Sequence, residues 1–387
     1  TERVSATYDS TNNKLVIAFK DAANSDRGTA IVGTVSGTSI SFGSEVVFET
    51  GGTDPISIKF VGSGKVVIAY KDLGNSQHGT AVVGTVSGTS ISFGTPVVFN
   101  ASEVNYPSVA YDSNSDKVVI CYQDNGNSNR GTAIIGTVSG TSISFAGETA
   151  FDSSTVYYPI PVFDSTNNKI VISYSDGGDS NYGNAIVGTV SGNSISFGSQ
   201  TRFTTATYQN HPGVHDSANN KIVFAYKDTA NSNYGTAIVG TVSGTSISFG
   251  TAVVFESASI TFPDIAFDSS NNKVVTSCID GGNSSKGTAS VGTVSGTSIS
   301  FGTPVVFGPA NTQQPTSTYD STSNKVIFAY RDASNSDYGT AVNFSVTSQT
   351  TNLTAENYIG IAAEAISNGA TGKINVLTGT NTGQTGL

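Results

Sequence analysis

The stretch Val32–Gly43, VGTVSGTSISFG, decides the fold of this chain, because it is copied almost verbatim along the sequence. Further copies begin at Val83, Val187, Val239 and Val291. A variant copy begins at Ile135 and has Ala146 in place of the last glycine, and the copy that begins at Val187 has Asn193 in place of a threonine. A seventh copy, due after Gly339, is missing.

Each copy predicts a β-hairpin. Gly37-Thr38 supplies a two-residue turn of type II′, with glycine at the first central position. With that turn, Val35 faces Ile40 as a β-branched pair, and the ring of Phe42 can lie over Gly33 opposite it. One hairpin cannot bury its own apolar face, so identical neighbours must cover it. The copying is therefore expected to be structural.

The repeat length follows from the aspartate that ends each β-rich run. This residue recurs as Asp21, Asp72, Asp124, Asp176, Asp228, Asp280 and Asp332. The first interval is 51 residues and the other five are 52 each, which makes seven repeats near the length of a propeller blade. In the third repeat, 107–112 and 117–124 are expected to be the first two strands. The hairpin and an apolar run such as 97–99 are expected to supply the third and fourth strands of each repeat.

The predicted fold is all-β, a seven-bladed β-propeller of four-stranded antiparallel blades over 1–347, with an open solenoid as the alternative. Residues 348–387 read as a partial C-terminal module for oligomerisation or linkage, with a helix-like patch at 362–366 and a strand at 373–377. Seven sets of three strands accompany only six fourth strands. We expect the last outer strand to come from residues upstream of Thr1 or from 349–359. The chain contains no Met, so its translated N-terminus is expected to lie outside it.

Composition excludes several classes of partner. The formal net charge is −10 and the pI is near 4.7, so the surface should repel nucleic-acid phosphates. No apolar run is long enough to span a membrane, and no membrane insertion is expected. Cys121 and Cys278 fall in the same strand of distant repeats, on opposite faces, so a disulfide between them is not expected.

No enzyme signature is present in the sequence. The chain has no Trp and five scattered arginines, unlike propeller sialidases, and too few glutamates for a propeller glycosidase. The aspartates of the first turn should accept backbone N–H bonds, namely Asp9, Asp112, Asp164, Asp216, Asp268 and Asp320. The motif D-x-x-N-S-x-x-G is expected to form an Asx-type turn and not a cation loop. The histidines are too dispersed for a three-His metal site, and no cofactor is expected.

Two loop positions vary between repeats and lie on one face of a propeller disc. The loop before the third strand carries Arg27, His78, Arg130, Tyr182, Tyr234, Lys286 and Tyr338. The entry to the first strand carries Arg3, Asp54, Tyr106, Tyr158, His211, Phe262 and Gln314. Alternating aromatic, basic and amide side chains suit the stacking and hydrogen bonding of sugars. The alternative is that these side chains are solvated or wedge between blades. The aromatic residues of the second strand recur in register and should be core, namely Phe19, Tyr70, Tyr122, Tyr174, Tyr226 and Tyr330.

The units NNKxVxxYxD and GTAxVGTVSGTSISFG resemble propeller repeats of environmental and marine bacteriophage structural proteins, typically tail-fibre-like proteins. The segment from Leu353 to Leu387 resembles a short module that follows such repeats. The resemblance implies a virion or extracellular surface location, a role in attachment to a host glycan or receptor, and a homo-oligomeric or larger assembly. A purely structural fibre subunit is the second reading, and a secreted glycan-active enzyme is the third.

Overall fold

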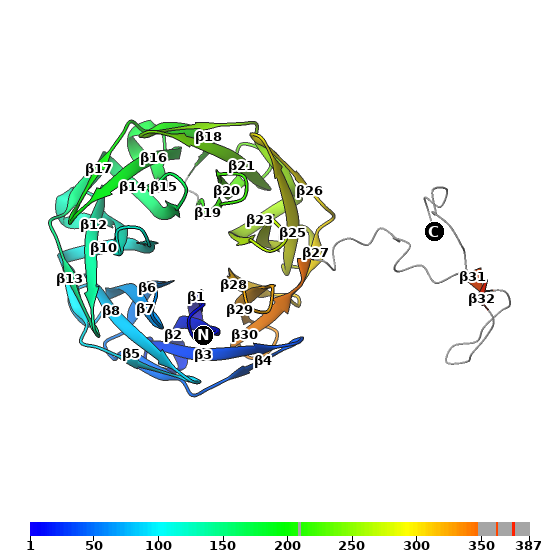
Figure 1. The fold of residues 1–387 in the computed structure, drawn as a ribbon, viewed down its shortest axis with the longest axis horizontal. Helices are drawn as coiled ribbons and strands as arrows, with labels where there is room; N and C mark the ends of the chain where they lie inside the picture. Colours follow the sequence, from blue (N-terminus) through cyan, green and yellow to red (C-terminus); the bar gives the residue numbers. More distant parts are fainter. Residues whose placement is uncertain (208–209, 347–360, 363–373, 376–387) are drawn as a thin grey trace. The chain divides into compact units, whose positions relative to one another are not determined.

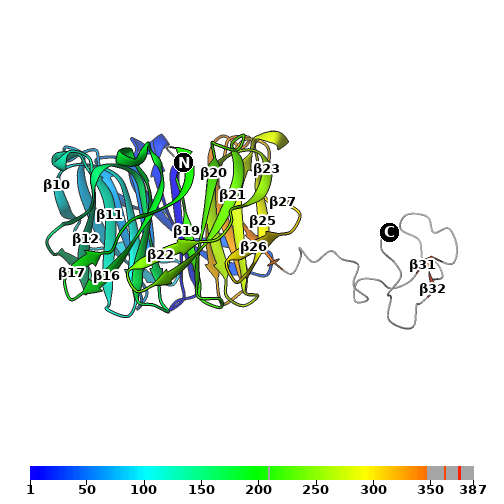
Figure 2. The ribbon, with the colours of Figure 1, turned by 90° about the horizontal axis from the view of Figure 1, so that it is seen from above.

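The computed structural model describes residues 1–207, 210–346, 361–362 and 374–375, and the chain divides into two compact parts, Thr1–Val346 and Thr347–Leu387. In the first part, antiparallel sheets stand side by side in a ring around a central axis (Figure 1). Seen from the side, the strands run between two opposite faces of the ring (Figure 2). The predicted all-β, antiparallel fold is confirmed.

The strands follow the sequence repeats in order, from the axis outward. The first strands are β1 (Glu2–Asp9), β6 (Thr53–Phe60), the ends of β10 (Val97–Asp112), β14 (Thr149–Asp164) and β23 (Val253–Asp268), β19 (Gly213–Asp216) and β28 (Thr312–Asp320). The second strands are β2 (Lys14–Asp21), β7 (Lys65–Asp72), β11 (Lys117–Asp124), β15 (Lys169–Asp176), β20 (Lys221–Asp228), β24 (Lys273–Asp280) and β29 (Lys325–Asp332). The third strands are β3 (Arg27–Ser36), β8 (His78–Ser87), β12 (Arg130–Ser139), β16 (Tyr182–Ser191), β21 (Tyr234–Ser243), β25 (Lys286–Ser295) and β30 (Tyr338–Phe344).

The outer edge of each of the first six repeats is built from two short pieces instead of one strand. The first pieces are β4 (Ser39–Phe42), β9 (Ser90–Phe93), β13 (Ser142–Phe145), β17 (Ser194–Phe197), β22 (Ser246–Phe249) and β26 (Ser298–Phe301). The second pieces are β5 (Val46–Glu49), the beginnings of β10, β14 and β23, β18 (Thr201–Thr207) and β27 (Val305–Val306). β10 pairs with β8 through its first half and with β11 through its second, so one continuous strand links neighbouring repeats.

The repeated hairpin has the predicted register. Val35 pairs with Ile40 and Gly33 with Phe42, and Gly37 adopts a positive φ of 58° at the turn. The structure also explains the last glycine of the motif. A Cβ on Gly43 would lie 1.8 Å from the carbonyl oxygen of Thr89, in the hairpin turn of the next repeat. The same contact recurs at three further glycines, Gly94, Gly198 and Gly250.

The two departures from the motif fall on the pair of positions that make this contact in other repeats. Gly94 lies against Thr141, which is one repeat ahead. The corresponding positions for the variant copy are Ala146 and Asn193. Where glycine is replaced by alanine, the facing threonine is therefore replaced as well. Copying of the motif therefore preserves a contact in which a hairpin turn rests on the hairpin of the preceding repeat.

The core lies between neighbouring repeats. In the described residues, each pair of adjacent repeats shares a hydrophobic cluster, such as the one that joins Val16 of the first repeat to Ile68 of the second. The predicted core aromatics of the second strand are buried, with Tyr70, Tyr122 and Tyr174 completely inaccessible. The ring closes by packing, because Leu15 and Ile17 share a cluster with Ile327 of the last repeat.

The last repeat differs from the others. Its three strands β28, β29 and β30 form a sheet to which no outer strand is added within the described residues. The predicted sources of that strand, upstream of Thr1 or within 349–359, lie outside the described residues. In the C-terminal part, β31 (Ile361–Ala362) pairs with β32 (Ile374–Asn375). Ala362, expected to begin a helix-like patch, is therefore in a strand, and 363–366 are not described.

Four short 3-10 helices follow second strands in the described part: η1 (Ala22–Asn24), η2 (Asn125–Asn127), η3 (Gly177–Asp179) and η4 (Gly281–Asn283).

Candidate functional site

The entries to the first strands bring side chains from all the repeats to the ring axis. Tyr106, Tyr158 and Phe262 each precede a buried proline and adopt φ of 53°, 52° and 49°. Arg3 and Gln314 adopt the same left-handed conformation at the corresponding positions. This conformation is uncommon for residues other than glycine, above all for bulky ones, and such outliers concentrate at functional sites. The residues lie in or next to β-bulges, which turn one side chain out of the strand's alternation.

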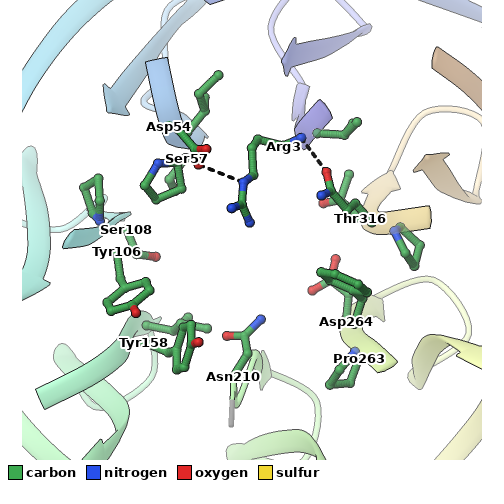
Figure 3. A pocket seen from close by; sticks show the side chains of 18 of the residues that line it. Arg3, Asp54, Ser57, Tyr106, Ser108, Tyr158, Asn210, Pro263, Asp264 and Thr316 are labelled. Carbon is green, nitrogen blue, oxygen red and sulfur yellow. Dashed lines mark hydrogen bonds and ion pairs between the residues drawn. The ribbon is translucent and has the colours of Figure 1, made fainter. Parts of the chain in front are cut away.

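These side chains surround a cavity of about 620 Å³, here called the axial cavity (Figure 3). Its rim is formed by Arg3, Asp54, Tyr106, Tyr158, Asn210, Phe262 and Gln314. Its wall includes Ser57, Ser108, Ile160, Asp264 and Thr316, from the first strands below the rim. A volume of this size falls within the range of small-molecule sites. The rim combines aromatic rings, two amides and one ion pair.

The aromatic side of the rim is formed by adjacent repeats. The ring centroids of Tyr106 and Tyr158 are 4.3 Å apart, at an interplanar angle of 47°. Burial and the neighbouring Tyr158 raise the pKa of Tyr106 to about 12, so its hydroxyl stays neutral in ordinary conditions. Phe262, across the rim, is 46% exposed. An exposed Phe and a close Tyr pair give a ligand apolar surface with hydroxyl groups at its edge.

The polar side of the rim is held in place by hydrogen bonds. Nε of Arg3 lies 2.7 Å from Oδ1 of Asp54, and the backbone N–H of Arg3 donates to Oε1 of Gln314. Deeper in the wall, the Asp264 carboxylate accepts bonds from the backbone N–H and the hydroxyl of Ser317. Burial raises the pKa of Asp264 to about 6. The axial cavity thus presents both hydrogen-bond donors and hydrogen-bond acceptors to a ligand.

The structure separates the predicted binding residues into two groups and leaves His211 in neither. Tyr106, Tyr158 and Phe262 line the axial cavity, together with the entry residues Arg3, Asp54 and Gln314. A second set begins the third strands and does not line that cavity: Arg27, His78, Arg130, Tyr182, Tyr234, Lys286 and Tyr338. Both sets lie on one face of the ring, since the backbone N–H of Thr53 donates to Asp26, next to Arg27.

The second set does not form one common pocket. The guanidinium of Arg202 covers the ring of Tyr182, 4.9 Å from its centroid. Tyr338 is 64% exposed and lines a different cavity at the edge of the last repeat. Arg130 is exposed, and the remaining members are half-buried.

The prediction that His211 belongs to the entry set is wrong. Its side chain is completely buried, with ring centroids of Phe203 and Tyr226 at 5.1 and 5.9 Å. The rim position is taken by Asn210. Counting back six residues from Asp216 gives Asn210, as counting back six from Asp112 gives Tyr106, so the repeat register carried this information.

The other expectations about chemistry can be compared with the described residues. The backbone N–H groups of Thr11 and Asn12 donate to Asp9, and the other first-turn aspartates accept equivalent bonds. Cys121 and Cys278 are free and buried, and burial raises the pKa of both thiols. The described part of the chain shows no group of three or more His, Cys, Asp or Glu side chains placed to hold a metal. Within that same part, no helix has the length and apolarity needed to cross a membrane.

No protein-family model and no curated protein matches this sequence. Solved structures with propeller-type folds do resemble it. The lectin BP39L from Burkholderia pseudomallei is 9% identical, with a TM-score of 0.69 over 88% of this chain and 95% of that chain. A protein from Lactobacillus plantarum is 10% identical, with a TM-score of 0.55 over 79% and 85%. A mutant of AofleA from Arthrobotrys oligospora is 10% identical, with a TM-score of 0.52 over 80% and 88%. At these identities the likeness concerns the fold.

Proposed function

We propose that this chain is a non-enzymatic carbohydrate-binding protein, built as a seven-bladed β-propeller that holds a glycan in its axial cavity. The blade count is supported by the seven sequence repeats and by the hydrophobic clusters between neighbouring repeats. The choice of ligand is supported by the likeness of the ring to a bacterial lectin. Fold alone does not specify function, so the chemistry of the cavity has to carry the proposal.

The observation that carries the proposal is the convergence of unlike side chains on the axial cavity. A sugar ring has an apolar C–H face and a rim of hydroxyl groups. Tyr106, Tyr158 and Phe262 offer the flat surfaces against which such a face stacks. Asn210 and Gln314 carry amide groups, which donate and accept hydrogen bonds as hydroxyls do. The left-handed backbone at the rim keeps several of these side chains directed at the axis.

The biological setting we propose is attachment at a virion or extracellular surface, as part of an oligomeric assembly. The support for this setting is the resemblance of the repeats and of Leu353–Leu387 to phage structural proteins. A structural fibre subunit without a ligand is the alternative. It is favoured by the verbatim hairpins, which serve packing and not binding.

A glycan-array screen tests the function and its location together. The proteins compared are the full chain, a Tyr106→Ala, Tyr158→Ala variant, and a matched Tyr234→Ala, Tyr338→Ala variant. The matched variant loses two aromatic side chains from the same face but outside the axial cavity. Circular dichroism melting curves establish that all three proteins are folded.

The proposal expects binding by the full chain and the matched variant, with at least a tenfold loss in the Tyr106→Ala, Tyr158→Ala variant, because each stacking contact contributes about 1 kcal/mol. Loss only in the matched variant would move the site to the outer set of loop residues. Absence of glycan binding by the folded full chain would favour the structural subunit.

A further inference from the structure

The third strands of repeats 1, 2, 3, 5 and 6 share one contact that the last repeat lacks. In these five repeats, the second residue of the third strand is a glycine covered by a phenylalanine ring from the outer strand. A Cβ on Gly28 would lie 2.4 Å from the ring of Phe48, and a Cβ on Gly79 would lie 2.3 Å from that of Phe99. The ring therefore occupies the space of a side chain. Similar contacts cover Gly131, Gly235 and Gly287.

The corresponding glycine of the last repeat, Gly339, has a different environment. Its nearest neighbours are the side-chain atoms of Thr1, at 3.2–3.6 Å from an added Cβ. Gly339 and Tyr338 are exposed, whereas Gly28 and Gly79 are buried. Next to Gly339 is a cavity of about 210 Å³ lined by side chains of the first repeat, including Ile17, Phe19, Ile31 and Phe42.

The residues that line this edge cavity correspond to those that hold a phenylalanine ring between other repeats. Phe48 packs between Tyr70 and Phe93 of the following repeat, at ring-centroid distances of 5.4 and 5.5 Å. By position in the repeat, Tyr70 corresponds to Phe19 and Phe93 to Phe42. Both of these counterparts line the edge cavity, and Phe42 is 41% exposed. The first repeat thus presents the aromatic walls of this contact, while the described last repeat supplies no phenylalanine to pack against them.

A hydrogen bond of Thr1 indicates in which register a further strand would pair with β30. The amino group of Thr1 donates to the carbonyl of Asp337 at 3.2 Å. The same bond joins Thr53 to Asp26 at 3.0 Å and Val104 to Gln77 at 3.2 Å. In those two repeats, the covering phenylalanine stands five residues before the donor, as Phe48 and Phe99. A strand leading into Thr1 would place its fifth preceding residue over Gly339.

We propose that the edge of β30 and its cavity form a strand-acceptor site. Its occupant is an extended segment of Val-Val-Phe type that runs antiparallel to β30 and leads into Thr1. The phenylalanine lies over Gly339 and fills the cavity against Phe19 and Phe42, while the backbone pairs with β30 as β5 pairs with β3. This is β-strand addition, in which main-chain bonds supply affinity and a side-chain pocket fixes the register. The inference does not depend on the proposed glycan site.

The test is to join a copy of Gly94–Glu103 ahead of Thr1 in the full chain. This segment ends where Val104 begins its equivalent bond, so its phenylalanine stands at the required distance. The matched control carries the same segment with Ser in place of that phenylalanine. We expect the first extension to raise Tm by roughly 3 °C, because it buries one aromatic side chain, and to slow amide exchange in β30. The control extension should give much less of either effect.

Gly339→Ala supplies the second control. An added Cβ would occupy the space of the phenylalanine ring, whereas without the extension its nearest neighbours are side-chain atoms of Thr1 at 3.2–3.6 Å. It should leave Tm of the original chain within about 1 °C and remove the gain produced by the extension. Equal Tm for the Phe and Ser extensions would overturn the proposal. So would a dimer of the original chain, measured by light scattering, that Gly339→Ala converts to monomer, because the occupant would then be a second copy.

Discussion

Gly235→Ala should destabilise the ring although the substitution adds a single methyl group. Gly235 is in β21, and its Cβ would lie 2.6 Å from Cε2 and 2.8 Å from Cζ of Phe255. Phe255 is 4% exposed and packs against Phe301, with ring centroids 5.7 Å apart. The ring must therefore move, because the added methyl is attached to a paired strand and cannot.

The magnitude follows from three contributions. Overpacking in a dense core costs about 1–3 kcal/mol. Disturbing the aromatic pair costs up to about 1 kcal/mol more. The lower conformational entropy of alanine in the unfolded chain offsets about 0.4–1 kcal/mol. The expected net loss in free energy of unfolding is about 2 kcal/mol.

Thermal and urea unfolding, followed by circular dichroism, measure this change as a shift of the midpoint. Gly339→Ala is the matched control, because it changes the same position of a repeat in which no phenylalanine ring covers the glycine. Gly235→Ala should lower Tm by roughly 3 °C, while Gly339→Ala should not lower it. Combining Gly235→Ala with Phe255→Leu should recover part of the loss. Equal shifts for the two alanine variants would refute the reasoning, since the cost would then come from the strand and not from the ring.

Three further predictions concern turns, pH and thiols. Asp112→Ala should lower the free energy of unfolding by about 1–3 kcal/mol in urea titrations, because two turn N–H groups lose their buried acceptor; an unchanged midpoint would contradict this role. Burial lowers the pKa of His211 to about 3, so the unfolded chain binds a proton near pH 6.5 that the folded chain does not, and stability falls with pH below 6.5. Between pH 7 and pH 5 His211 should account for a loss of about 2 kcal/mol, so the stability of His211→Phe should depend less on pH over that range, and parallel curves would exclude the effect. Cys121 and Cys278 should resist a thiol reagent in the native state and react in denaturant, and fast native labelling of either would show that the strand is open.

Much of the local structure could be predicted from the sequence because it depends on neighbours within a repeat. The hairpin register follows from the position of Gly37 in the turn, and the first-turn aspartates bond to N–H groups two and three residues away. The burial of Tyr70 and its counterparts follows from a strand that is apolar on both faces. These features depend on residues that are close in sequence and on the presence of a neighbouring repeat, whatever its exact position.

The candidate site could be predicted only in part. The entry residues vary between repeats, but so do the loop residues before the third strands, and variability does not distinguish Tyr106, which lines the axial cavity, from Tyr234, which does not. His211 and Asn210 are adjacent in sequence, and the register of β19 decides that one is buried and the other reaches the rim.

The sequence by itself determined the repeat, its strands and its turns, since periodic apolar residues and glycines act over short distances. Tertiary structure alone decided which side chains meet across repeats, because the distance between them depends on how the ring closes. Phe48 needs the wall of the next repeat, and Gly43 needs its turn. The axial cavity requires all the repeats at once, and no local pattern specifies its width or its lining.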